Sequence, residues 1–168
     1  MNNSTPTYSL PLTDYRTYCY AGLFILGNIL LPQLCHMIPK GGLIFLPIYF
    51  FTLIGAYKYG WRVGLLTAIL SPLINSALFA MPAPQMLPVI LVKSSLLAVV
   101  AAFVAQKSKA VTLLSLLIVV LTYQVLGGIA EGFVTGNVLA GVQDFRLGFP
   151  GLLIQLFGGY AILKYVLK

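Results

Sequence analysis

Residues 71–93 read SPLINSALFAMPAPQMLPVILVK, and the interpretation of the whole chain starts from them. They contain the end of one apolar segment, a proline-rich break over residues 82–88 and the start of another apolar segment. Asn75 and Lys93 are polar side chains inside those two apolar segments. They would be ordinary residues in a soluble protein, but the composition indicates that the solvent here is lipid.

The composition is that of a membrane protein. Of the 168 residues, 60% are hydrophobic and 8% are charged, and the mean hydropathy is +0.97. Because about a quarter of the residues of a soluble domain are charged, the composition excludes a soluble fold. A helical crossing takes roughly 20 apolar residues, so the chain has room for about six crossings. We therefore expect a single membrane domain over residues 1–168.

The apolar segments predict six transmembrane helices and an all-α integral membrane protein. The predicted helices cover residues 17–38, 43–59, 61–80, 87–105, 110–130 and 148–167. Pro32 and Pro72 fall inside the first and third helices, where each is expected to produce a kink. Residues 1–16 form a short polar segment that lacks the basic start and apolar core of a signal peptide.

Basic residues are distributed unevenly between the two sides of the predicted bundle. The side that holds both termini and the second and fourth connections carries Arg16, Lys58, Arg62, Lys107, Lys109, Lys164 and Lys168. The other side carries only Lys40 and Arg146. Since cytoplasmic loops are enriched in Lys and Arg, we expect both termini to be cytoplasmic. The same bias explains the net charge of +7 without a nucleic-acid partner.

Polar side chains gather in the outer half of the predicted bundle. Asn75, Lys93, Gln124 and Gln155 fall roughly 8–10 Å from the outer ends of their helices, at 1.5 Å per residue. This one-sided distribution predicts an outward-facing pocket for a small molecule. The candidate substrate-binding residues are Gln33, His36, Asn75, Lys93, Gln124, Glu131 and Gln155.

The role of Lys93 has two interpretations. A charge inside the membrane costs about 2.5–3.5 kcal/mol, so its ammonium group is not expected to face lipid. It can bind a carboxylate or phosphate of a ligand, or it can extend to the headgroups or pair with Glu131 to hold helices together. The amides have a similar alternative, because hydrogen bonds between helices are common in membrane proteins.

Catalytic and metal sites have little support in the sequence. Cys35 and His36 are adjacent and point roughly 100° apart on a helix, and no further histidine exists to complete a metal site. Cys19 and Cys35 would lie roughly 24 Å apart on one helix, which is too far for a disulfide. The chain has no Ser/His/Asp set with a meaningful spacing and no GxxxxGK[ST] motif. We expect no enzyme activity, cofactor or metal.

Two stretches carry a resemblance to a known family. LPQLCHMIPKGGLIFLPIYFFTLIGAYKYGW (31–61) and LSPLINSALFAMPAPQMLPVILVK (70–93) resemble substrate-binding S components of energy-coupling factor (ECF) vitamin transporters. The resemblance covers nearly the whole chain. It implies a multi-pass protein of a prokaryotic inner (plasma) membrane, with both termini cytoplasmic, that captures a vitamin or vitamin-like molecule under its outer loops.

The resemblance also implies partners and a ligand type. The partners are an energising module of one membrane scaffold subunit and two ATPase subunits. In that family, small residues spaced AxxxA on the first helix contact the scaffold, and Thr17 and Ala21 are the closest match here. Similar members have an acidic residue at the position of Lys93, so the lysine implies a different or more anionic ligand.

Two other classes of function stay open. Rod-shape-determining membrane scaffolds have a similar size and a six-helix layout, and they need no ligand. The outer polar residues argue against that class, because a scaffold has no need of lysine and glutamine there. A membrane-embedded enzyme would need a catalytic constellation that the sequence lacks. Small molecules that co-purify with the protein would separate ligand binding from scaffolding.

Overall fold

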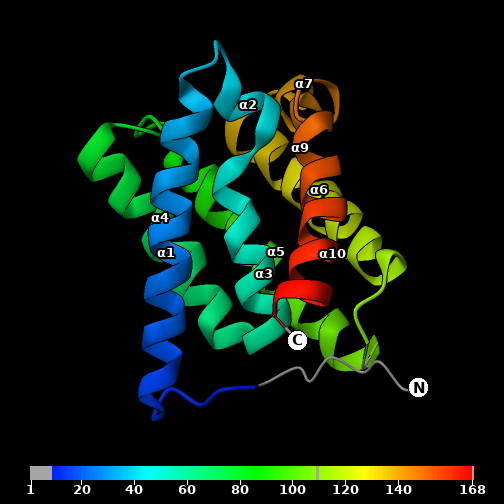
Figure 1. Cartoon of the computed structure of the whole chain (residues 1–168). Coiled ribbons are helices and arrows are strands. Elements are labelled where there is room, and N and C mark those ends of the chain that lie inside the picture. The colour runs from blue at the N-terminus through cyan, green and yellow to red at the C-terminus, as the bar shows by residue number, and fades with distance from the viewer. Residues whose placement is uncertain (1–8, 109, 168) are drawn as a thin grey trace.

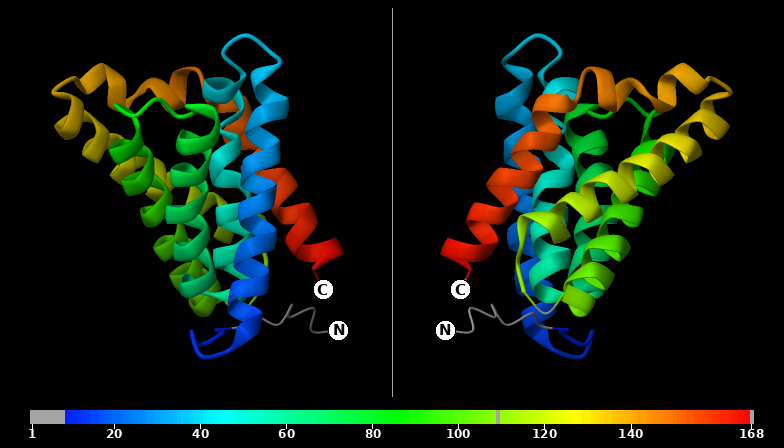
Figure 2. Two further views of the ribbon diagram at one scale, coloured as in Figure 1. Left: turned by 90° about the vertical axis from the view of Figure 1, so that its left-hand side faces the viewer. Right: turned by 90° about the vertical axis from the view of Figure 1, so that its right-hand side faces the viewer.

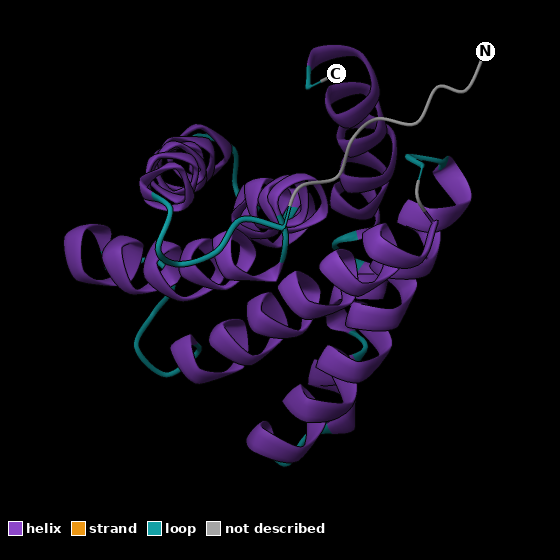
Figure 3. Cartoon of the chain, turned by 90° about the horizontal axis from the view of Figure 1, so that it is seen from below, coloured by secondary structure: helices purple, strands orange, loops and turns teal. Residues whose placement is uncertain are grey.

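The computed structural model of the protein describes residues 9–108 and 110–167. Every regular element within these ranges is helical (Figure 3). Five helices are long and apolar enough to cross a membrane, which makes the chain a multi-pass membrane protein of the all-α class. They are α1 (Tyr15–His36), α4 (Trp61–Phe79), α5 (Leu87–Ser108), α6 (Leu113–Thr135) and the C-terminal segment Phe149–Val166.

The predicted helix over residues 43–59 is broken, and the expectation of a continuous helix there is wrong. The structure divides it into α2 (Gly41–Phe45), the 3₁₀ turn η1 (Pro47–Tyr49) and α3 (Phe50–Tyr59). The break lies at Leu46, whose φ of 47° and ψ of 45° are left-handed. Because the residue before a proline avoids the right-handed helical region, Pro47 ends α2 and starts η1.

α3 is the central helix of the bundle. All its residues from Thr52 to Tyr59 are buried, and it packs against α1, α4 and α5, as Figure 1 shows. A Cβ atom on Gly64 of α4 would lie 2.5 Å from the Cβ of Ala56 in α3. Small residues at such contacts let helices approach closely, which is how helices associate in lipid.

The C-terminal segment is not a regular α-helix. It consists of α9 (Phe149–Leu153), the π-helical η2 (Ile154–Gly158), α10 (Gly159–Ala161) and the π-helical η3 (Ile162–Val166). The predicted helix over residues 148–167 therefore has the expected position, but its backbone is widened twice. Such π-helical turns are rare in proteins, and those that occur are often found at functional sites.

The connections divide the bundle into two ends, which Figure 2 shows. The connections 37–40, 80–86 and 136–148 lie together and are called the loop end. The connection 136–148 contains α7 (Val138–Gly141) and α8 (Gln143–Arg146). The start of α1, the connection between α3 and α4, and the end of the C-terminal segment lie at the opposite end, called the terminal end. The predicted segment 1–16 lies partly outside the described residues.

Candidate ligand-binding site

Three charged side chains meet beneath the loop end and form what we call the ion cluster. Lys93 Nζ of α5 donates to Glu131 Oε2 of α6 and to Asp144 Oδ2 of α8, the second at 2.8 Å. The exposed fractions are 2% for Lys93, 5% for Glu131 and 8% for Asp144. The cluster therefore joins α5, α6 and the 136–148 connection through charges that are shielded from water.

Glycines place these charges together. A Cβ atom on Gly127 would lie 2.7 Å from Lys93 Cγ, so the glycine lets the lysine stem lie across α6. Glu131 follows Gly127 by about one helical turn and lies on the same face. Gly128 of α6 and Gly141 of α7 contact each other through their backbones, with no room for a Cβ atom on either. This contact holds α7 on α6 and brings α8, with Asp144, over the lysine.

The structure gives Lys93 two partners within the chain. Of the two interpretations of Lys93, the structure shows pairing with Glu131. It adds a second ion pair, between Lys93 and Asp144. Asp144 was not among the predicted site residues. One signal could have found it: the chain has only three acidic residues, and two of them lie on or near the predicted loop that faces a lysine inside the membrane.

Several buried polar atoms near this end have no hydrogen-bond partner among the described residues. They are Ser94 Oγ, both amide atoms of Gln124 and Nε2 of Gln155. The Tyr123 hydroxyl donates to Gln155 Oε1 at 2.7 Å, which fixes that glutamine in the π-helical η2. An unpaired buried polar group costs about 1–3 kcal/mol, so this arrangement has hydrogen-bonding capacity that the fold leaves unused.

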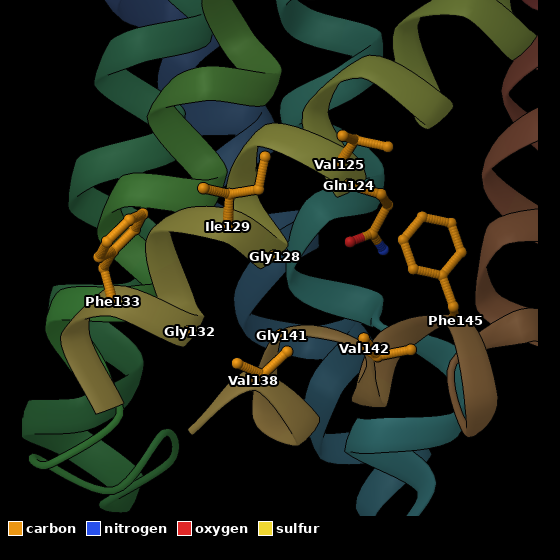
Figure 4. Close-up of a pocket in the computed structure, with 10 residues that line it drawn as sticks. All are labelled: Gln124, Val125, Gly128, Ile129, Gly132, Phe133, Val138, Gly141, Val142 and Phe145. Atoms are coloured by element: carbon orange, nitrogen blue, oxygen red, sulfur yellow. The ribbon is translucent and has the colours of Figure 1, made fainter. Parts of the chain in front are cut away.

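A pocket of about 410 Å³ lies between α6 and the 136–148 connection. Figure 4 shows the Gln124 amide directed into the space in front of Phe145. The rest of the lining is apolar, and Gln124 is its one strongly polar side chain. The lining residues are Gln124, Val125, Gly128, Ile129, Gly132, Phe133, Val138, Gly141, Val142 and Phe145.

The pocket has an apolar lining with one amide, that of Gln124, and a mostly apolar lining with a few placed polar groups is typical of sites for small molecules. The ion cluster, Ser94 and Gln155 are buried nearby and are not part of that lining. Within the described residues, no three His, Cys, Asp or Glu side chains are placed to hold a metal ion. Comparisons with protein-family models, with curated proteins and with solved structures found no match.

Asn75 belongs to a different polar group, next to Pro32 in α1. Pro32 has no N–H, so the carbonyl of Asn28 lacks its helical partner. Asn75 Nδ2 of α4 donates to that carbonyl at 2.8 Å. The Asn28 side chain donates to Thr52 Oγ1 at 3.0 Å and accepts from the Phe51 backbone N–H at 3.2 Å. In this structure Asn75 therefore links α1 and α4.

Gln33 and His36 lie on α1. No hydrogen bond among the described residues joins them to the ion cluster. His36 lines a second pocket of about 410 Å³ between the 37–40 and 80–86 connections, together with Lys40 and Met86. Gln33 Nε2 is buried without a partner. The predicted site residues therefore separate: Lys93, Glu131, Gln124 and Gln155 lie on α5, α6 and η2, Asn75 bonds α1, and Gln33 and His36 lie near the end of α1.

The predicted docking pair on α1 is turned inward. Thr17 and Ala21 are both buried in the bundle, and Thr17 Oγ1 donates to the Pro11 carbonyl at 2.7 Å. The small residue of α1 that faces open space is the neighbouring Gly22. Thr17 and Ala21 therefore stabilise the fold and present no surface to a partner in this structure.

Proposed function

We propose that the protein is the substrate-binding subunit of a membrane transporter of the ECF S-component type. One observation carries this proposal: Ser94, Gln124 and Gln155 are buried beside the ion cluster with polar atoms unpaired. A scaffold gains nothing from such atoms, because each unpaired group costs about 1–3 kcal/mol. A binding protein recovers that free energy when a ligand supplies the missing hydrogen bonds.

In this proposal α2, η1 and α3 together make a sixth crossing. The start of α1 and the end of the C-terminal segment both lie at the terminal end (Figure 2). An even number of crossings is needed to return a chain to the side on which it began. Because α3 is surrounded by the other helices, its short length does not prevent it from lying at membrane depth.

The terminal end is proposed to be cytoplasmic. Exposed Trp61 pairs there with half-buried Arg62, whose guanidinium is 4.8 Å from the indole centroid, and Lys164 lies 4.8 Å from the Tyr160 ring centroid. Aromatic and basic side chains of this kind are typical of membrane interfaces, and basic residues favour the cytoplasmic side. Lys109 and Lys168, which belong to the same count, lie outside the described residues.

With this orientation the ligand enters from outside, beneath the loop end. The substrate would be a vitamin or vitamin-like molecule. The sequence resemblance implies that uptake needs an energising module of one membrane scaffold subunit and two ATPase subunits, and the chain itself has no nucleotide-binding motif. The proposed location is the inner membrane of a prokaryote. These features rest on the sequence resemblance together with the unpaired polar atoms.

Mass spectrometry of small molecules extracted from the purified protein tests the proposal. Gln124→Met removes two unpaired amide atoms, so this variant should fold at least as well as the parent and lose the bound molecule. Val99→Leu, on an exposed position of α5, is the matched control and should retain it. A protein that carries no small molecule would support the scaffold class instead. The same amount of a small molecule in all three forms would contradict the role assigned to the unpaired Gln124 amide.

A further inference from the structure

We propose that the substrate carries a positive charge, which it presents to the carboxylates of Glu131 and Asp144. This inference rests on the proposed binding function and adds the chemical class of the ligand. It reverses the expectation of an anionic ligand at Lys93, because the ammonium of Lys93 is already held by two carboxylates.

The charge of the ion cluster is unbalanced. One ammonium faces two carboxylates, and all three residues are more than nine-tenths buried. The chain has three acidic residues in total, and the third, Asp14, caps α1 at the terminal end. A buried charge without a counterion is costly, so the cluster favours one additional positive charge.

The carboxylates have the capacity to hold that charge. Lys93 is bonded to Oε2 of Glu131 and Oδ2 of Asp144. Among the described residues, no hydrogen bond engages Oε1 of Glu131 or Oδ1 of Asp144. A carboxylate accepts through both of its oxygens, and a charged donor gives a stronger hydrogen bond than a neutral one. Each carboxylate therefore keeps one oxygen that can accept a hydrogen bond from an amine or a similar cation.

The unpaired polar side chains point to a ligand in the same region. Gln124 precedes Glu131 by seven residues, so both lie on one face of α6. It is 1% exposed, has no partner and is directed into the pocket that Phe145, the neighbour of Asp144, helps to line (Figure 4). Ser94, also buried and unpaired, follows Lys93 directly. A ligand that bonds these neutral groups would place its charged end at the ion cluster.

A bound proton would also remove the excess negative charge. In that case one carboxylate is neutral and a cationic molecule has no advantage over a neutral one of the same shape. The two possibilities therefore differ in a measurable preference.

The test uses the full-length protein in lipid nanodiscs with three probes of similar shape: benzylamine, benzyl alcohol and benzoate. Melting temperatures are measured over a range of probe concentrations. Benzylamine should bind at least about tenfold more tightly than benzyl alcohol, and benzoate most weakly. Asp144→Asn and Glu131→Gln each remove the excess charge, so either variant should lose this preference. Asp14→Asn, at the other end of the bundle, should keep it.

The outcomes separate this inference from the proposed function. Stabilisation by benzyl alcohol or benzoate equal to that by benzylamine would overturn the cationic ligand while small-molecule binding stands. A preference for benzylamine that persists in both Asp144→Asn and Glu131→Gln would also overturn it, because the charge would then be recognised elsewhere. Absence of any shift with the three probes overturns it as well, and the mass spectrometry described above then decides the function independently.

Discussion

The side-chain amide of Asn75 donates a 2.8 Å hydrogen bond to the backbone carbonyl of Asn28. That carbonyl is free because Pro32, four residues later in α1, has no N–H to donate to it. Prolines are tolerated in membrane helices where a neighbouring helix satisfies the freed backbone group. The side chain of Asn75 in α4 therefore replaces the backbone hydrogen bond that Pro32 removes from α1.

This relationship predicts a dependence between two substitutions. Asn75→Leu should lower the free energy of unfolding by about 1–3 kcal/mol, since the Asn28 carbonyl is left buried and unpaired. In a Pro32→Ala background the backbone N–H at position 32 can bond that carbonyl, so Asn75→Leu should cost less. Unfolding in detergent of both single variants and the double variant measures the difference. An equal cost in both backgrounds would contradict the role assigned to Asn75.

The ion cluster predicts a strong effect of Lys93→Met. Removing the ammonium leaves Glu131 and Asp144 buried without a counterion. Breaking a buried ion pair in this way destabilises a fold by about 3–5 kcal/mol. Replacing the carboxylates as well, with Glu131→Gln and Asp144→Asn, should restore much of the loss. Melting temperatures in detergent compare the single and triple variants. If Lys93→Met melts like the parent, the cluster does not stabilise the fold.

Gly127 is predicted to be essential for the position of Lys93. Gly127→Ala would place a Cβ atom 2.7 Å from Lys93 Cγ, so the lysine stem must move and the ion cluster must loosen. Gly22→Ala is the control, because a Cβ atom there meets nothing within 4 Å, and alanine favours a helix by about 0.8–1 kcal/mol over glycine. We expect Gly127→Ala to lower the melting temperature and Gly22→Ala to leave it unchanged or raise it. The reverse order would exclude this packing.

The proposed orientation predicts a labelling pattern. In a background with Cys19→Ala and Cys35→Ala, Ala83→Cys lies in the loop-end connection and Gln106→Cys lies near the terminal end, both at exposed positions. An impermeant thiol reagent added to intact cells should label the first and not the second. Labelling of Gln106→Cys alone would place the ion cluster and its pocket on the cytoplasmic side.

The apolar pattern of the sequence predicted most of the helices but few of the side-chain contacts at the site. The apolar segments placed α1, α4, α5, α6 and the C-terminal segment within a few residues of their observed bounds. The break at Leu46 was missed, although Pro47 was a visible signal for it. The π-helical turns around Gln155 have no signal of that kind in the sequence. For the site, Glu131 was identified as a possible partner of Lys93, and a hydrogen bond between helices was an alternative role for Asn75, while Asp144 was not identified.

The sequence by itself determined that this is an all-helical membrane protein and where its long helices run. The physical reason is local: backbone in lipid needs its hydrogen bonds satisfied, and a continuous apolar run of about 20 residues satisfies nearly all of them within itself as a helix. Only the tertiary structure decided which polar side chains meet. Lys93 and Asp144 are 51 residues apart, and they come together because Gly128 and Gly141 allow two backbones to touch. That contact depends on how α7 folds back onto α6, which no single segment of the sequence specifies.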